Sequence, residues 1–339
     1  MMRIAFEEMK STVERALLNA GLAAEQAAIC AQIHTESSCD GIYSHGLNRV
    51  PRFVEYLHKG WVRADARPEK IKALSVMEIW DGHQGPGITN ALLAIERAME
   101  LAKQHGIGLV AMRNSSHWMR GGSYGWRAAE QGMAAICWTN TESCMPAWGG
   151  KDTRVGNNPF VMAVPGKPGP LVLDMAMSQY SYGKLQVTRL KGESLPYPGG
   201  YDQQGNLTCE PGPIEASMRI LPAGYWKGSG FAILLDAMAA LLSAGYATPQ
   251  IDRLGRGSGT GASQIFMVFD PEQLGGGDFT ERMAQSIGDY VNSSQPAEGI
   301  SAVTWPGQRQ RSTREDNLRH GIPVDDGVWQ QVQQLAIAG

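Results

Sequence analysis

The sequence predicts a mixed helix-and-sheet protein, of the α+β or α/β class, in which a separate helical unit precedes a sheet-containing region. Apolar residues recur at helical spacing in residues 6–57, whereas short apolar strands alternate with helices from residue 76 onwards. No Gly-x-Gly-x-x-Gly run follows a strand and opens a helix, so a standard Rossmann nucleotide site is not visible. The 339 residues are enough for two domains.

Composition narrows the class of protein. A net charge of −3 and a pI near 6.2 argue against nucleic-acid binding and favour a small substrate. The odd number of cysteines, with no Cys-x-x-Cys pair, indicates free thiols in a reducing cytoplasm. The scattered histidines give no metal-ligand spacing. No secretory signal and no apolar run of membrane-spanning length is present, so we expect a cytoplasmic protein without membrane contact.

The first helices are predicted at residues 6–19, where Gly21 is placed to end the helix, and at residues 24–37. A third helix carries the apolar residues of 50–57 and ends at Gly60. We expect residues 1–70 to form an N-terminal helical domain, joined by C-terminal helices within 280–339. We expect residues 71–279 to form a mixed sheet-and-helix domain.

The run Tyr43-Ser44-His45-Gly46-Leu47-Asn48-Arg49 is the first candidate for chemistry. An imidazole titrates near neutrality and can donate a proton to a carbonyl, and the guanidinium fork of Arg49 suits a carboxylate. If a helix begins near Ser44, both side chains share one face. The alternative is an ordinary helix start, with Ser44 as N-cap, and Pro51 fits better in the first turn of a helix capped by Asn48.

The remaining elements follow from periodicity and turn residues. A Pro- and charge-rich link covers 63–72, a long polar excursion covers 183–221, and a basic segment covers 309–319. Strands are predicted at residues 76–80, 107–112, 133–139, 160–164, 171–173 and 264–269, and helices at 89–104, 231–243, 279–293 and 328–336.

Several loops carry side chains that could either take part in a functional site or stabilise a turn or helix end. The loop 113–125 places His117 between a strand and a helix, where functional loops collect. Asn157 and Asn158 precede a proline and suit either a tight turn or a cofactor amide. Asp174 ends a strand, where it can accept from ribose hydroxyls or cap a helix. Residues 226–230 stand at the start of an apolar helix, where they could form an anion-binding site or a flexible connection into the helix.

These motifs, taken together, are more specific than any one of them. The sequence resembles the malate/L-lactate dehydrogenase-2 oxidoreductases through essentially its whole length. The matching strings are Ser44-His45-Gly46 with Arg49, residues 117–125, Gly156-Asn157-Asn158-Pro159, Leu173-Asp174-Met175 and Trp226-Lys227-Gly228-Ser229-Gly230.

The resemblance implies an NAD(P)-dependent reductase of a 2-oxo acid, with a non-Rossmann cofactor fold and usually a homodimer. It implies that His45 is the proton donor and that Arg49 and His117 contact the substrate. The implied cofactor contacts are Pro170, Leu171, Val172, Leu173, Asp174, Met175, Ala176, Trp226, Lys227, Gly307, Gln308 and Arg309. NAD is the expected cofactor, but Arg309 would suit the 2′-phosphate of NADP. Diketogulonate is the expected substrate, and malate, lactate and ureidoglycolate are the alternatives.

Two readings from other classes remain open. Gly121-Gly122-Ser123-Tyr124-Gly125 fits the nucleophile-elbow pattern of a serine hydrolase, and His320 follows late in the chain. An eight-residue loop separates Gly121 from its strand, which is unlike the sharp turn of that fold. A noncatalytic protein that binds the cofactor or the acid without turnover is the other reading.

Overall fold

The structure is a computed structural model that describes residues 2–337. Its α-helices are α1 (Phe6–Asn19), α2 (Ala24–Cys39), α3 (Val50–His58), α4 (Gly87–His105), α5 (Gly122–Glu130), α6 (Tyr182–Leu190), α7 (Pro211–Ser217), α8 (Trp226–Ser243), α9 (Thr248–Leu254), α10 (Gly277–Asn292), α11 (Gln308–His320) and α12 (Asp326–Ile337). Three short 3-10 helices are η1 (Tyr43–His45), η2 (Leu47–Arg49) and η3 (Pro271–Gln273).

A seven-stranded mixed sheet has the order β2-β3-β4-β12-β5-β8-β9. These strands are β2 (Glu69–Leu74), β3 (Met77–Asp81), β4 (Ile107–Ser115), β12 (Ala262–Phe269), β5 (Ala134–Thr139), β8 (Phe160–Val164) and β9 (Leu171–Met175). Strands β3 and β4 are parallel, and the other neighbouring pairs of this sheet are antiparallel. The two-stranded pairs are β1 (Met2–Ile4) with β13 (Ile322–Val324), β6 (Met145–Pro146) with β7 (Thr153–Val155), and β10 (Gly200–Tyr201) with β11 (Leu207–Thr208).

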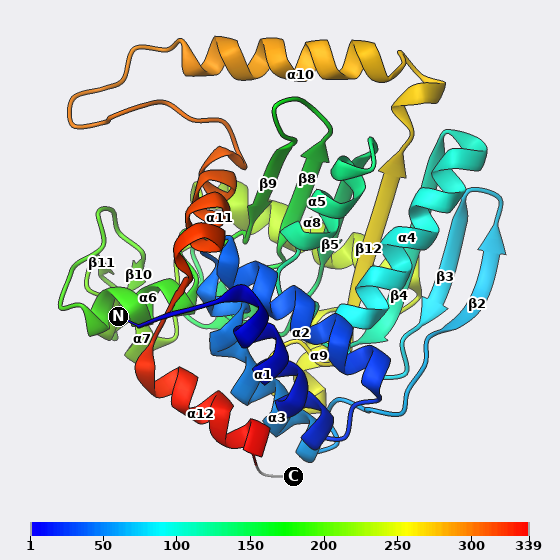
Figure 1. Ribbon diagram of the computed structural model, residues 1–339. Coiled ribbons are helices and arrows are strands. Elements are labelled where there is room, and N and C mark those ends of the chain that lie inside the picture. Colours follow the sequence, from blue (N-terminus) through cyan, green and yellow to red (C-terminus); the bar gives the residue numbers. More distant parts are fainter. Residues whose placement is uncertain (1, 338–339) are drawn as a thin grey trace.

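Apolar side chains bury both faces of the central sheet. Helices α4 and α5 cover one face, where Ile95, Tyr124 and Phe266 belong to one core cluster. Helix α8 covers the other face through a cluster that includes Leu235 and Ile265. In Figure 1 the sheet therefore lies between two helical layers. This arrangement is the expected mixed α/β class, because each apolar sheet face needs a covering layer.

A third core cluster belongs to the helical unit at the N-terminus. Val13, Leu17 and Phe53 from α1 and α3 are buried there with Val332 of α12. Helix α11 contacts α2, and β13 pairs with β1, so the end of the chain returns to its beginning. By contrast, α10 extends away from this unit, across the ends of β8, β9 and β12, and a long loop joins it to α11 (Figure 1). The division into domains at residues 70 and 279 stays a prediction.

The structure corrects three sequence-based expectations. The link 63–72 contains part of strand β2, whose residues are all exposed, so the strand has no buried face. The basic segment 309–319 lies within helix α11, which is polar almost all round. Helix α8 begins at Trp226 rather than near residue 231, so Lys227 lies in its first turn and not in a loop before it.

No single helix among residues 2–337 has the length and apolar character needed to cross a membrane. Helices α8 and α9 meet that criterion of length and composition only as a pair, with a bend of 80° between them.

Candidate active site

Two 3-10 helices, not one α-helix, carry His45, the candidate proton donor, and Arg49, the candidate carboxylate-binding residue. His45 ends η1 and Arg49 ends η2, with Gly46 between them at φ −103° and ψ −128°. The expectation that a helix from Ser44 puts both side chains on one face by i,i+4 spacing is therefore wrong. Pro51 lies in the first turn of α3, as a helix starting after the run requires.

Helix α2 fixes the junction between these turns. His34 Nδ1 lies 3.1 Å from the Gly46 carbonyl oxygen, and Ser38 Oγ accepts a 2.8 Å hydrogen bond from the Leu47 N–H. A Cβ at position 46 would overlap Ser38 Oγ, so only glycine permits this approach of the backbone to α2. Packing against α2 thus replaces helical spacing as the device that places His45 and Arg49.

His45 is half-buried beside positive charges. Its Nδ1 lies 2.9 Å from Ser44 Oγ. Burial, and then the guanidinium groups of Arg49 and Arg120, lower the pKa of His45 to about 4. In the protein without an anionic ligand, His45 is therefore neutral at pH 7, and an anion that pairs with Arg49 would raise its pKa.

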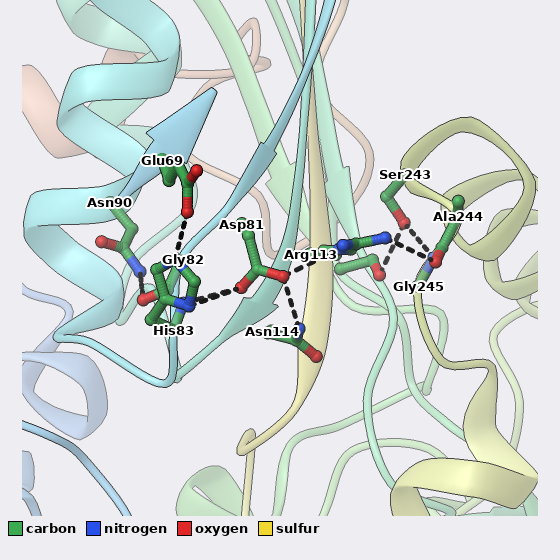
Figure 2. A network of polar contacts seen from close by, with 11 residues as sticks. Glu69, Asp81, Gly82, His83, Asn90, Arg113, Asn114, Ser243, Ala244 and Gly245 are labelled. Atoms are coloured by element: carbon green, nitrogen blue, oxygen red, sulfur yellow. Dashed lines mark hydrogen bonds and ion pairs between the residues drawn. The ribbon is translucent and has the colours of Figure 1, made fainter. Parts of the chain in front are cut away.

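A polar network holds the loop that carries the second histidine. Asp81 at the end of β3 accepts hydrogen bonds of 2.9 Å from Arg113 Nε and from Asn114 Nδ2. Figure 2 shows this carboxylate at the centre of the network, with Arg113 reaching on towards Ala244. Ser116, two residues after Asn114, donates from Oγ to the Gly85 carbonyl oxygen at 2.9 Å. The end of β4 is thus tied to β3, and the residue immediately before His117 is tied to the segment that follows β3.

His117 faces His45. The Met119 N–H donates to His117 Nδ1 at 2.8 Å, so the neutral ring carries its proton on Nε2. The ring centroids of His45 and His117 are 5.7 Å apart, with 38° between the planes. Burial, together with the charge of Arg49, holds the pKa of His117 well below its usual range. His117 is therefore a neutral hydrogen-bond donor beside His45.

Arg49 is the half-buried cation of this site, and the exposed Arg52 also lines it. The Arg49 guanidinium donates to Ser258 Oγ at 3.2 Å, and no carboxylate of the described chain forms an ion pair with it. Burial lowers the pKa of Arg49, but a guanidinium stays charged at neutral pH. A small cavity lies beside it, lined by Arg49, Arg52, Phe53, Tyr56, Val62, Ser116, His117, Met119 and Ser258. A guanidinium without a carboxylate partner beside His117 favours binding of an anion at this cavity, and His45 adjoins the cavity through His117 rather than by lining it.

The predicted cofactor-binding segments lie near one another at the β9 edge of the sheet. The Val172 N–H donates to the Pro306 carbonyl oxygen at 2.9 Å, so the backbone before Gly307 lies along β9. The Ala223 N–H donates to the Met177 carbonyl oxygen at 2.8 Å, which brings the residues before α8 to the end of the same segment. The side chains of Leu173, Trp226, Lys227 and Arg309 are exposed.

Arg120 connects this edge to the histidines. It is 4% exposed, forms an ion pair with Asp40, and places Nε 4.0 Å from Asp174 Oδ2. Asp174 Oδ2 also accepts the Gly122 N–H at 2.8 Å. Partial burial raises the pKa of Asp174, while Arg120 opposes that rise. Arg120 also lowers the pKa of His45, so its charge acts on both Asp174 at the predicted cofactor edge and the predicted proton donor.

Sequence reasoning missed His34, Asp40, Arg120 and Ser258 as parts of this site. His34 and Ser38 share a face of α2, and a histidine among the apolar positions of that helix was a usable signal. Asp40 and Ser258 gave no such signal, because they reach the site only through tertiary packing. Asn158 is structural, since its side chain accepts from the Thr141 N–H and donates to the Ala232 carbonyl oxygen.

The geometry does not support the serine hydrolase. Ser123 lies in the first turn of α5, and its buried Oγ has no hydrogen-bond partner in the described part of the chain. His320 is at the end of α11, where its Nδ1 lies 2.9 Å from Asp316 Oδ1 at the surface. A nucleophile and its base must lie within hydrogen-bond reach of each other. Here Ser123 Oγ is buried in α5, whereas His320 lies beside Asp316 at the surface.

Comparison with known proteins decides the family. The family model described as malate/L-lactate dehydrogenase matches residues 4–333. The chain belongs to this family. Proteins named 2,3-diketo-L-gulonate reductase from Citrobacter koseri and from Escherichia coli K12 are each 46% identical over 334 residues, covering 98% of this chain and 100% of the relative.

Solved structures of the malate/L-lactate dehydrogenase type share the whole fold. Malate dehydrogenase from Pyrococcus horikoshii OT3 is 26% identical, with a TM-score of 0.90 and coverage of 99% of this chain and 95% of that one. Sulfolactate dehydrogenase from Methanocaldococcus jannaschii is 27% identical, with a TM-score of 0.89 and coverage of 99% and 97%. The protein is accordingly an oxidoreductase of the hydroxy-acid and oxo-acid class, and the dehydrogenases of its family use a nicotinamide cofactor.

Proposed function

We propose that this protein reduces the 2-oxo group of 2,3-diketo-L-gulonate to give 3-dehydro-L-gulonate, with NADH as the reductant. The observation that carries the proposal is the meeting of His45 and His117, 5.7 Å apart, with the unpaired charge of Arg49 beside them. The full-length relatives at 46% identity bear the name of this reductase and support the choice of substrate. Malate, lactate and ureidoglycolate are the competing acids.

Each of the three side chains has one task in this reaction. Arg49 holds the C1 carboxylate through its planar fork and so fixes which carbonyl carbon is reduced. His117 donates from Nε2 to an oxygen of the bound acid. His45 gives a proton to the C2 oxygen as that oxygen gains negative charge, and the product is a hydroxyl group. General acid help of this kind contributes about 10²–10⁴-fold.

The residues at the β9 edge fit a nicotinamide cofactor. Arg120 Nε and Ser123 Oγ are buried polar atoms without a hydrogen-bond partner in the described chain. Arg120 Nε lies 4.0 Å from Asp174 Oδ2, and Ser123 follows Gly122, whose N–H donates to the same oxygen. A bound ribose or amide group would satisfy such atoms, which otherwise carry a desolvation cost. Reduced nicotinamide supplies the hydride when bound. The exposed guanidinium of Arg309, in the first turn of α11, favours NADPH as the alternative.

We also propose that the protein is a homodimer. Helix α8 buries one side on the sheet and exposes large apolar side chains on the other, which are Phe231, Ile233, Leu234, Met238 and Leu241. Monomers rarely expose an apolar surface along a whole helix, and a second copy would bury it. Sedimentation or light scattering measures the mass directly, and Leu234→Glu should shift it towards the mass of one chain.

The test of the proposed activity is a panel of oxo acids, each assayed with NADH and with NADPH. We expect 2,3-diketo-L-gulonate with NADH to give the highest kcat/KM. A higher kcat/KM with NADPH, lost in Arg309→Ala, would instead select NADP. Turnover with pyruvate or oxaloacetate above that with the diketo acid would replace the proposed substrate. Binding of NADH without any turnover would favour the noncatalytic reading.

A further inference from the structure

The alternating-glycine run after α9 lies at the candidate active site. Gly255, Gly257, Gly259 and Gly261 all have positive φ, between 57° and 77°. We call residues 256–261 the glycine loop. It connects α9 to β12, and its Ser258 lines the cavity together with Arg49 and His117. The run fails as a nucleotide fingerprint because a strand follows it, and so its glycines need another explanation.

Two of these glycines allow contacts that no other residue permits. A Cβ at position 259 would lie 2.8 Å from both Cβ and Cδ2 of His117. A Cβ at position 257 would overlap the Tyr56 hydroxyl and lie 2.9 Å from the Trp61 ring. In contrast, a Cβ at position 255 would meet nothing within 4 Å. The backbone of the glycine loop therefore packs directly on the face of His117, and Gly255 does not take part.

Hydrogen bonds on both sides hold the loop in this position. The Ser258 N–H donates to the Tyr56 hydroxyl oxygen at 2.9 Å, which ties the loop to α3. The Gly259 N–H donates to Glu142 Oε2 at 2.8 Å, which ties it to the segment after β5. Because Ser258 Oγ accepts from Arg49 at 3.2 Å, the same loop restrains the guanidinium.

We infer that the glycine loop is a positioning element for the reaction. It sets the orientation of His117 through backbone contact at Gly259 and the orientation of Arg49 through Ser258. Neither residue of the loop reacts. This inference rests on the proposed function for its kinetic consequence, since His117 and Arg49 hold the oxo acid there. Displacing a positioned group by about 1 Å can cost about 10²-fold in rate.

Gly259→Ala tests the inference, with Gly255→Ala as the matched control. Both substitutions place alanine at a positive φ, +76° and +60°, so they strain the backbone in the same way. Only the first puts a methyl group against His117. We expect Gly259→Ala to lower kcat/KM by about 10²-fold, and Gly255→Ala to stay within about threefold of the wild type. NADH affinity, measured by fluorescence titration, should be equal in both variants.

Histidine NMR gives a readout that does not need turnover. In full-length protein with ¹³C-labelled histidine, the His117 Cε1 resonance should shift in Gly259→Ala and stay in place in Gly255→Ala. If the wild type reduces no oxo acid, the proposed function fails while this comparison still decides the inference. Equal kcat/KM losses in the two variants, or an unmoved His117 resonance in Gly259→Ala, would overturn it.

Ser258 provides a separate test of the link to Arg49. Ser258→Ala removes the hydroxyl that accepts from the guanidinium, and we expect the KM for the oxo acid to rise about 3- to 10-fold with little change in kcat. Ser258→Thr keeps a hydroxyl group and should restore the KM. A KM that does not respond to Ser258→Ala, or that Ser258→Thr fails to restore, would remove Ser258 from the positioning element.

Discussion

The imidazole rings of His45 and His117 lie with their centroids 5.7 Å apart, although 71 residues separate them in the sequence. One ring comes from the turns that follow α2, and the other from the loop that follows β4. Both have a lowered pKa for the same reasons, burial and nearby arginine charge. The two rings are therefore neutral until an anion enters, which makes substrate binding and proton supply interdependent.

His45→Gln should lower kcat for oxo-acid reduction by about 10²–10⁴-fold, because glutamine cannot deliver a proton to the developing alkoxide. The amide is close in size to imidazole, so NADH binding should change by less than about threefold. Steady-state kinetics and fluorescence titration measure the two quantities. If the variant turns over at the wild-type rate, His45 is not the proton donor.

Arg49→Lys keeps the charge and loses the planar fork. We expect the KM for the oxo acid to rise about 10- to 100-fold, which is the worth of one charge-assisted hydrogen bond. NADH affinity should stay the same. The assay compares a 2-oxo acid with the matching aldehyde that lacks the carboxylate. A variant that discriminates between the two as well as the wild type does would rule out Arg49 as the carboxylate clamp.

The pH dependence should differ between free enzyme and complex. Reduction needs the imidazolium of His45, whose pKa is about 4 without substrate, so kcat/KM should already be falling between pH 5 and pH 7. A carboxylate on Arg49 removes part of the opposing charge and raises the pKa of His45. The profile of kcat should therefore stay level to higher pH than that of kcat/KM. Coincident midpoints for the two profiles would refute this coupling.

His34 should make the protein less stable in acid. It is buried, and burial lowers its pKa to about 4, so between pH 6.5 and pH 4 the unfolded chain takes up a proton that the folded chain does not. Stability is thus fully present above pH 6.5 and falls as the pH drops, by up to about 3 kcal/mol for this residue. The lowered pKa values of His45 and His117 act in the same direction.

His34→Asn isolates this contribution. The asparagine amide can donate to the Gly46 carbonyl oxygen in place of Nδ1, but it does not titrate. Urea unfolding at pH 7, 6 and 5 should show a shallower loss of stability in the variant than in the wild type. Equal slopes in the two proteins would show that His34 does not contribute to the pH dependence.

Periodicity predicted the elements that bury one face. Helix α1 was predicted with its observed bounds, and strand β8 likewise, because their apolar residues mark the buried side. Strand β2 and helix α11 escaped prediction, since the first is exposed throughout and the second is polar almost all round. Such elements form because neighbours supply hydrogen bonds and packing, which a local pattern does not record.

The candidate site shows the same division. His45, Arg49 and His117 could be singled out by residue type and by the resemblance of their surrounding motifs, and the structure brings them to one place. Their support could not be foreseen. The contact between Gly46 and α2 and the approach of Gly259 to His117 join segments far apart in the sequence. The i,i+4 argument for His45 and Arg49 was wrong for this reason, because tertiary packing determines the path of the backbone there.

The most direct measurement is a crystal structure of the protein with NADH and oxamate, an unreactive analogue of a 2-oxo acid. We expect the Arg49 guanidinium to bind the oxamate carboxylate with two hydrogen bonds. We also expect a His45 ring nitrogen to lie within about 3.2 Å of the oxygen that replaces the reducible carbonyl oxygen. Oxamate bound away from Arg49, or His45 turned from both oxamate and nicotinamide, would contradict the proposed roles of these two residues.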